Sequence, residues 1–140
     1  MDSSALGRVG RLAQPMTLGA LARALADVLP ATAQGVRAAG DFDRTIETVA
    51  LCAGAGDSLL SDPQVRAADV YITSDLRHHP ASEARESSRL RGGPALLDVS
   101  HWASEWLWLD TAAAQLRAAL PTAEVLVSEL RTDPWDFAIV

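Results

Sequence analysis

The stretch Leu97-Asp98-Val99-Ser100-His101-Trp102-Ala103-Ser104-Glu105 joins an apolar strand directly to a polar helix start. Ser100 can cap this helix, because a serine oxygen accepts a hydrogen bond from the backbone of the first turn. His101 and Glu105 are four residues apart and therefore lie on one side of the helix. Imidazole and carboxylate groups both bind divalent metals, so the pair predicts two ligands of one ion. We expect the helix N-terminus to keep the imidazole neutral, which is the state that binds a metal.

The same alternation of strand and helix recurs along the chain. Apolar runs at 48–52, 70–73, 95–99 and 125–127 alternate with expected helices at 57–68, 80–90 and 101–120. Such alternation is typical of βαβ units, so it predicts an α/β fold with a mostly parallel sheet and helices on its faces. Pro63 is expected to limit or interrupt the first of these helices.

The first part of the chain is less regular. Residues 1–16 are expected to form an extended entry segment or a short strand, and residues 17–140 a single α/β domain. Apolar residues at helical spacing predict a helix over 17–29, capped by Thr17 and closed by Pro30. A short strand is expected within 35–39.

Three loops of the predicted sheet carry most of the polar chemistry. They are 54–58, 74–79 and 100–105, and they include all three histidines of the chain. Each follows the carboxyl end of a predicted parallel strand. These ends lie together at one edge, where ligands collect in open parallel sheets, so we expect the loops to share one site.

Several of these residues have two interpretations. Asp75 either orients a histidine or is a turn residue that ends a strand. His79, and less so His78, either faces the cleft or belongs to a solvated helix entry before Pro80. Asp75 and His79 are therefore the candidate catalytic residues, and His101 with Glu105 is either a metal-binding pair or a plain helix start with a nearby acid.

Two further patterns also keep two interpretations. The turn Gly54-Ala55-Gly56-Asp57-Ser58 either binds a phosphate group or is a tight strand-to-helix turn, since Leu59 stands where a dinucleotide fingerprint has its third glycine. Trp102, Trp106 and Trp108 are expected to be core residues or subunit contacts, with at least one at an oligomer interface.

Composition limits the classes of function. The 140 residues fit one domain, and the net charge of −6 without a basic stripe argues against nucleic-acid binding. All twelve basic residues are arginine, which excludes lysine-based catalysis and a phosphate-loop lysine.

Cys52 is the only cysteine, so no intrachain disulfide exists, and we expect it inside a strand. The chain has no apolar run long enough for a bilayer and no signal-peptide pattern at Met1-Asp2-Ser3-Ser4, so we expect a cytoplasmic protein that does not bind a membrane.

Four segments resemble one known family. They are Gly7-Arg8-Val9-Gly10-Arg11-Leu12, the run 68–79 (ADVYITSDLRHH), the run 98–105 (DVSHWASE) and Thr132-Asp133-Pro134-Trp135. Together they resemble the Nif-three-like family of dinuclear metal-centre hexameric proteins, also called GTP cyclohydrolase 1 type 2 homologues. The resemblance extends over nearly the whole chain.

The resemblance implies a two-lobed α/β protein of which this chain is the C-terminal half. It implies two divalent metals per complete site, with His101 and Glu105 as the ligands from this half and the remaining ligands from a missing N-terminal half. It also implies a ring-shaped homohexamer, a cytoplasmic location and a metal-dependent hydrolase of unknown substrate. Zn, Mn, Fe and Co all suit such ligands. The alternative is a non-enzymatic interaction or regulatory module that keeps the fold and the oligomer surface.

Overall fold

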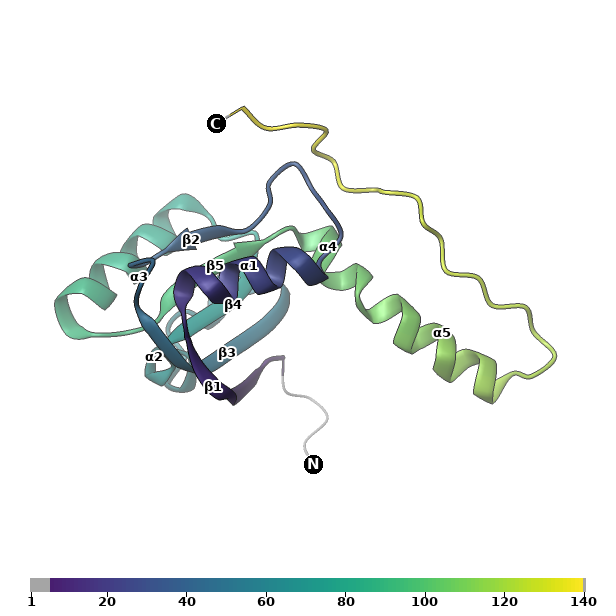
Figure 1. Ribbon diagram of the computed structural model, residues 1–140, viewed down its shortest axis with the longest axis horizontal. Helices are drawn as coiled ribbons and strands as arrows, with labels where there is room; N and C mark the ends of the chain where they lie inside the picture. The colour runs from purple at the N-terminus through teal and green to yellow at the C-terminus, as the bar shows by residue number, and fades with distance from the viewer. Residues whose placement is uncertain (1–5, 140) are drawn as a thin grey trace.

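The computed structural model describes residues 6–139, in which five strands form one sheet and helices cover both of its faces (Figure 1). The strands are β1 (Arg8–Thr17), β2 (Arg37–Ala39), β3 (Thr45–Ala55), β4 (Val70–Ser74) and β5 (Ala95–Val99). The helices are α1 (Leu18–Val28), the 3-10 turn η1 (Asp57–Leu59), α2 (Pro63–Ala67), α3 (His78–Arg91), α4 (His101–Trp106) and α5 (Trp108–Ala119).

The order of strands in the sheet is β1-β3-β4-β5-β2. The three central strands are parallel, because helical segments connect β3 to β4 and β4 to β5. Both edge strands run antiparallel to their neighbours, β1 against β3 and β2 against β5. The predicted α/β fold is therefore confirmed, with its parallel part confined to the centre.

Each face of the sheet has its own apolar layer. On one face, α1 packs Leu18 and Leu21 against Ile46, Val70 and Leu97. On the other face, α2 and α3 pack against a layer that includes Cys52, Tyr71 and Leu96. Strands β4 and β5 are buried along their whole length because both of their faces are covered. Cys52 is buried within β3, as predicted.

Most of the predicted helices occur, with two interruptions. Thr17 caps α1 by accepting a hydrogen bond from the amide of Ala20, as predicted. The helix expected over 57–68 is divided into η1 and α2, because Asp62 caps a new helix that begins at Pro63. The helix expected over 101–120 is divided at Leu107 into α4 and α5.

The strand predicted at 125–127 is wrong. These residues belong to an irregular segment that follows α5 and makes no ladder with the sheet. An apolar run alone was therefore a misleading signal for a strand at this point of the chain. Residues 8–17 form β1, a full partner of β3, while residues 1–5 of the expected entry segment lie outside the described residues.

Helix α5 extends away from the sheet, and the segment after it turns back toward the body (Figure 1). One buried contact holds the far end of this segment to the body: the hydroxyl of Ser100 donates to Asp133 Oδ1 at 2.7 Å. Large apolar side chains along α5 and the segment stay exposed, namely Trp108, Leu116, Leu126, Leu130, Trp135, Phe137 and Ile139. No helix within residues 6–139 has the length and apolar character needed to cross a bilayer.

Candidate metal site

His101 lies between two carboxylates at the carboxyl edge of the central strands. Its Nδ1 is 2.7 Å from Asp75 Oδ2, and its Nε2 is 2.9 Å from Glu105 Oε1. Asp75 follows β4, while His101 and Glu105 lie one turn apart on α4, after β5. The structure thus brings together three of the four predicted site residues.

Ser100 fixes the direction of α4. As predicted, it is the N-cap, and its hydroxyl accepts a hydrogen bond from the amide of Ala103 at 3.3 Å. The same hydroxyl donates to Asp133, so both of its hydrogen-bonding roles are filled while it is buried. The orientation of His101 is therefore coupled to a residue far along the chain.

Ser104 ties the start of α4 to the two strands beneath it. Its hydroxyl donates to the carbonyl of His101 at 2.8 Å, accepts from the amide of Gly54 at 3.4 Å and lies 3.2 Å from the hydroxyl of Ser74. Gly54 lies in the irregular part of β3 that follows Leu51, and Ser74 ends β4. The three predicted loops therefore meet at one edge, as expected.

Gly54 leaves space beneath the His101–Glu105 pair. A Cβ at this position would lie 3.3 Å from Glu105 Oε1 and 3.5 Å from His101 Nε2, and the φ of Gly54 is +70°. A left-handed φ strains any residue with a side chain. The glycine is thus required by backbone conformation and by the nearness of these two polar atoms.

The carboxylates determine the protonation of His101. Its hydrogen bond with Asp75 raises the pKa of the imidazole, Glu105 raises it further, and partial burial opposes both. This direction is opposite to the one expected from the helix N-terminus, which favours the neutral ring. Two nearby carboxylates outweigh one end of a short helix.

Gly56, the second glycine of the 54–58 loop, is required by close contacts with its neighbours. The hydroxyl of Tyr71 donates to the carbonyl of Gly56 at 2.8 Å, and burial raises the pKa of Tyr71 to about 12. A Cβ on Gly56 would meet Tyr71 Oη at 2.3 Å and Thr73 Oγ1 at 2.2 Å. The helix start that follows is only the short turn η1, with the acidic Asp57 in it. These contacts favour the tight-turn interpretation over a phosphate cradle.

The other two histidines do not join this group. His78 and His79 begin α3 and are exposed, and their rings contact each other edge to face. No contact joins His79 to Asp75, His101 or Glu105 within residues 6–139. The interpretation of His79 as a solvated helix entry is the one that the geometry favours.

Two of the three tryptophans contact other residues of the chain, and the third is exposed. The rings of Trp102 and Trp106 pack with centroids 6.4 Å apart, and Trp106 Nε1 donates to the carbonyl of Ser128. Trp108 is 57% exposed at the start of α5. Trp108 is therefore the one of the three that is free for a subunit contact.

The donor set fits part of a metal site. Within residues 6–139, no three His, Cys, Asp or Glu side chains gather closely enough to hold a metal ion. His101 Nε2 and Glu105 Oε1 nevertheless offer one nitrogen and one oxygen side by side, while Asp75 occupies the other ring nitrogen. A carboxylate on the far nitrogen is the usual partner of a metal-binding histidine. Further ligands would have to come from outside the described residues.

Comparison with known proteins agrees with this fold. The family model of Duf34/NIF3 (NGG1p interacting factor 3) matches residues 2–134. The chain belongs to the Duf34/NIF3 family. The earlier resemblance to Nif-three-like proteins is thereby confirmed.

Relatives of this family are longer than the chain. It is 49% identical to the GTP cyclohydrolase 1 type 2 homolog of Mycobacterium leprae over 94% of its own length and 33% of that protein's. It is 48% identical to the homolog of Streptomyces coelicolor over 93% and 46% of the two lengths. The chain also resembles the crystal structure of a Bacillus cereus protein related to NIF3, with a TM-score of 0.79 and 25% sequence identity. The matched region covers 96% of this chain and 36% of the Bacillus cereus chain. The chain thus spans a third to a half of these relatives.

Proposed function

We propose that this chain provides one part of a divalent-metal site of a Duf34/NIF3-family hydrolase. His101 Nε2 and Glu105 Oε1 are its two ligands, and Asp75 is a positioning residue. The observation that carries the proposal is the placement of His101 between two carboxylates, one on each ring nitrogen. Zn, Mn, Fe and Co all accept this nitrogen and oxygen pair.

Asp75 would control which nitrogen of His101 is free. By accepting the Nδ1 proton it holds the ring in one tautomer, so the lone pair of Nε2 points toward Glu105. In the chain without a metal, the raised pKa of His101 favours the doubly protonated ring, in which Nε2 donates to Glu105. Metal binding would release this proton, so metal affinity should fall as the pH is lowered through the pKa of His101.

Ser100 and Ser104 would keep the ligands in place. Their hydrogen bonds fix the first turn of α4 to Asp133 and to the amide of Gly54. A site held by such a network loses little side-chain freedom when an ion binds. When bound, a divalent cation supplies Lewis-acid chemistry and a stronger water nucleophile at neutral pH.

The site needs residues beyond this chain. Two ligands fall short of the four of a tetrahedral zinc site. The chain spans a third to a half of the relatives it matches, so we propose that it corresponds to their C-terminal half and that the N-terminal half supplies the other ligands. Because these relatives are named GTP cyclohydrolase 1 type 2 homologs, a cyclohydrolase reaction on GTP is the first reaction to test, and the substrate itself stays unassigned.

Metal titration by isothermal calorimetry tests the proposal. The samples are the chain, His101→Ala and the control His79→Ala, each with Zn²⁺ or Mn²⁺, alone and with the N-terminal half of the Streptomyces coelicolor relative. We expect binding by the wild-type and control proteins, with about ten-fold or more weakening in His101→Ala. Equal affinity in all three proteins, or no binding with either metal even in the presence of the added half, would overturn the assignment.

A second candidate function is that of an interaction module, favoured by the exposed arm formed by α5 and residues 120–139. Trp108, Leu126 and Phe137 are 57%, 81% and 77% exposed, and exposed apolar surface of this kind marks interaction sites when it is contiguous. We propose that this arm joins copies of the chain into the homo-oligomer, a hexamer by resemblance. Light scattering after gel filtration should give a mass several times that of the chain, and Trp108→Ser should reduce it. A monomeric wild type would count against this function and leave the metal proposal intact.

A further inference from the structure

A groove of about 320 Å³ lies between β2 and α3, and neither His101 nor Glu105 lines it. Its floor is apolar and its walls carry basic side chains. The residues that line it are Arg37, Ala38, Ala39, Leu76, His78, Ala81, Ser82, Arg85, Leu96 and Asp98. Neither the metal proposal nor the arm uses this groove.

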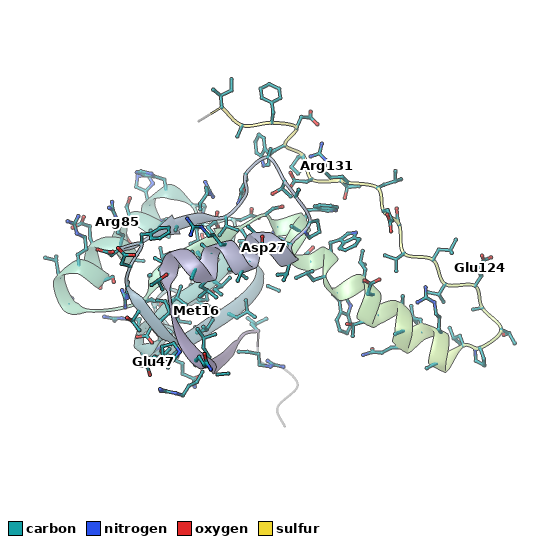
Figure 2. All side chains as sticks on the ribbon, viewed as in Figure 1. Met16, Asp27, Glu47, Arg85, Glu124 and Arg131 are labelled. Carbon is teal, nitrogen blue, oxygen red and sulfur yellow. The ribbon has the colours of Figure 1, made fainter. Side chains whose placement is uncertain are left out.

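Hydrogen-bond donors on one face of α3 line the groove. His78, Ser82 and Arg85 are spaced by four and three residues and so lie along one side of the helix. Figure 2 labels Arg85 on this helix. Within residues 6–139, neither the guanidinium of Arg85 nor the hydroxyl of Ser82 has a hydrogen bond or ion pair. Three groups able to donate therefore face the groove without an acceptor.

The single carboxylate in the groove is already satisfied. Asp98 is 5% exposed, and its Oδ2 accepts from Arg37 and from Gln34, while its Oδ1 accepts from the amide of Leu76 at 2.9 Å. Arg37 uses its Nε and one terminal nitrogen for this contact, which leaves the other terminal nitrogen available. Asp98 thus neutralises Arg37 but not Arg85.

The acids nearest in sequence to Arg85 do not cancel its charge in the groove. Glu83 lines a different hollow, together with Asp57 and Arg66. Glu86 is exposed and does not line the groove. In a chain with a net charge of −6, a groove with two arginines, a histidine and one neutralised carboxylate is locally cationic.

We propose that this groove binds a small phosphomonoester. The phosphate oxygens would accept from Arg85, Ser82, His78 and the free nitrogen of Arg37, because the planar guanidinium suits phosphate geometry. The body of the ester would lie on the apolar floor formed by Ala39, Leu76 and Leu96. A groove of this size holds a small ligand.

The test is a titration of the full chain followed by amide chemical shifts, in buffer with a chelator so that no metal contributes. The probes are phenyl phosphate and inorganic phosphate. We expect saturable shifts centred on Leu76, Ser82 and Arg85, with tighter binding of phenyl phosphate because its ring covers the apolar floor. Arg85→Gln should weaken phenyl phosphate about ten-fold or more.

Arg91→Gln is the matched control, because it removes the same charge from the same helix at a residue that does not line the groove. Its affinity should equal that of the wild type. The proposal is overturned by non-saturating shifts, by equal loss in the two variants, by equal affinity for both probes, or by shifts centred on residues 54–58. Because the chelator removes metals, the result is independent of the His101 site.

Discussion

The carboxylate of Asp133 accepts a buried 2.7 Å hydrogen bond from Ser100, the residue that caps the helix carrying His101 and Glu105. Asp133 is 8% exposed although the residues around it are open to solvent. The contact joins the C-terminal segment to the candidate metal site. The C-terminal segment therefore helps to hold in place the helix that carries the candidate metal ligands.

Asp133→Ala should therefore destabilise the protein. It leaves the buried Ser100 hydroxyl without an acceptor, which costs about 1–3 kcal/mol of unfolding free energy. Urea denaturation measures this change. Asp136→Ala is the control, because Asp136 is exposed and pairs only with Arg131. Equal stability of the two variants would show that the Ser100 contact does not hold the segment.

Asp75→Asn should lower the pKa of His101. The largest cause of the raised pKa is the hydrogen bond with Asp75, and a neutral amide oxygen accepts a weaker hydrogen bond than a carboxylate does. A titration of the His101 ring signal by NMR measures the shift, with Asp57→Asn as a control at a neighbouring loop. Because the folded pKa lies above the unfolded one, the stabilisation from protonated His101 is complete below pH 6.5 and is lost as the pH rises through the folded pKa. An unchanged pKa in Asp75→Asn would contradict the assigned pairing.

Gly54→Ala should disturb the site and cost about 1–2 kcal/mol from its left-handed backbone alone. The added methyl group would also lie within 3.5 Å of His101 Nε2 and Glu105 Oε1. Ring signals of His101 should shift, and metal affinity should fall. Gly10→Ala is the control, because a Cβ there meets nothing within 4 Å. A Gly54→Ala variant with wild-type His101 ring signals and wild-type stability would show that the site does not require a glycine at this position.

Asp69 should make the fold sensitive to acid. Burial raises its pKa, but hydrogen bonds from the amides of Thr48 and Glu47 outweigh this and leave the pKa below 3.8. Its stabilisation is therefore present above pH 3.8 and is lost as the pH falls through the folded pKa. Asp69→Asn should unfold at lower urea concentration than the wild type at pH 7, with the difference shrinking toward pH 3. A difference that stays constant with pH would contradict this.

The sequence predicted the central architecture because burial on two faces leaves a clear pattern. The runs at 70–73 and 95–99 are mostly apolar, and both became strands that are buried along their whole length. The run at 125–127 is also apolar but pairs with no strand of the sheet, and nothing local in its sequence reveals this. Apolar character alone therefore does not distinguish a strand from an exposed segment.

Part of the site was predictable and part was not. The spacing of His101 and Glu105 and the cap at Ser100 follow from helical geometry, so local sequence contains them. The pairing of Asp75 with His101 depends on two neighbouring strands, and the sequence indicated only that their loops share an edge. Asp133 was missed as a site residue because its partner is distant in sequence and its own segment has no regular structure.

Anomalous diffraction from crystals of the chain soaked with Zn²⁺ tests the metal assignment most directly. We expect one peak at about 2.0–2.2 Å from both His101 Nε2 and a Glu105 carboxylate oxygen, with Asp75 still hydrogen-bonded to Nδ1. Crystals of Glu105→Gln should give a much weaker peak. A peak at His78 and His79 instead, or full zinc occupancy away from His101, would contradict the central claim.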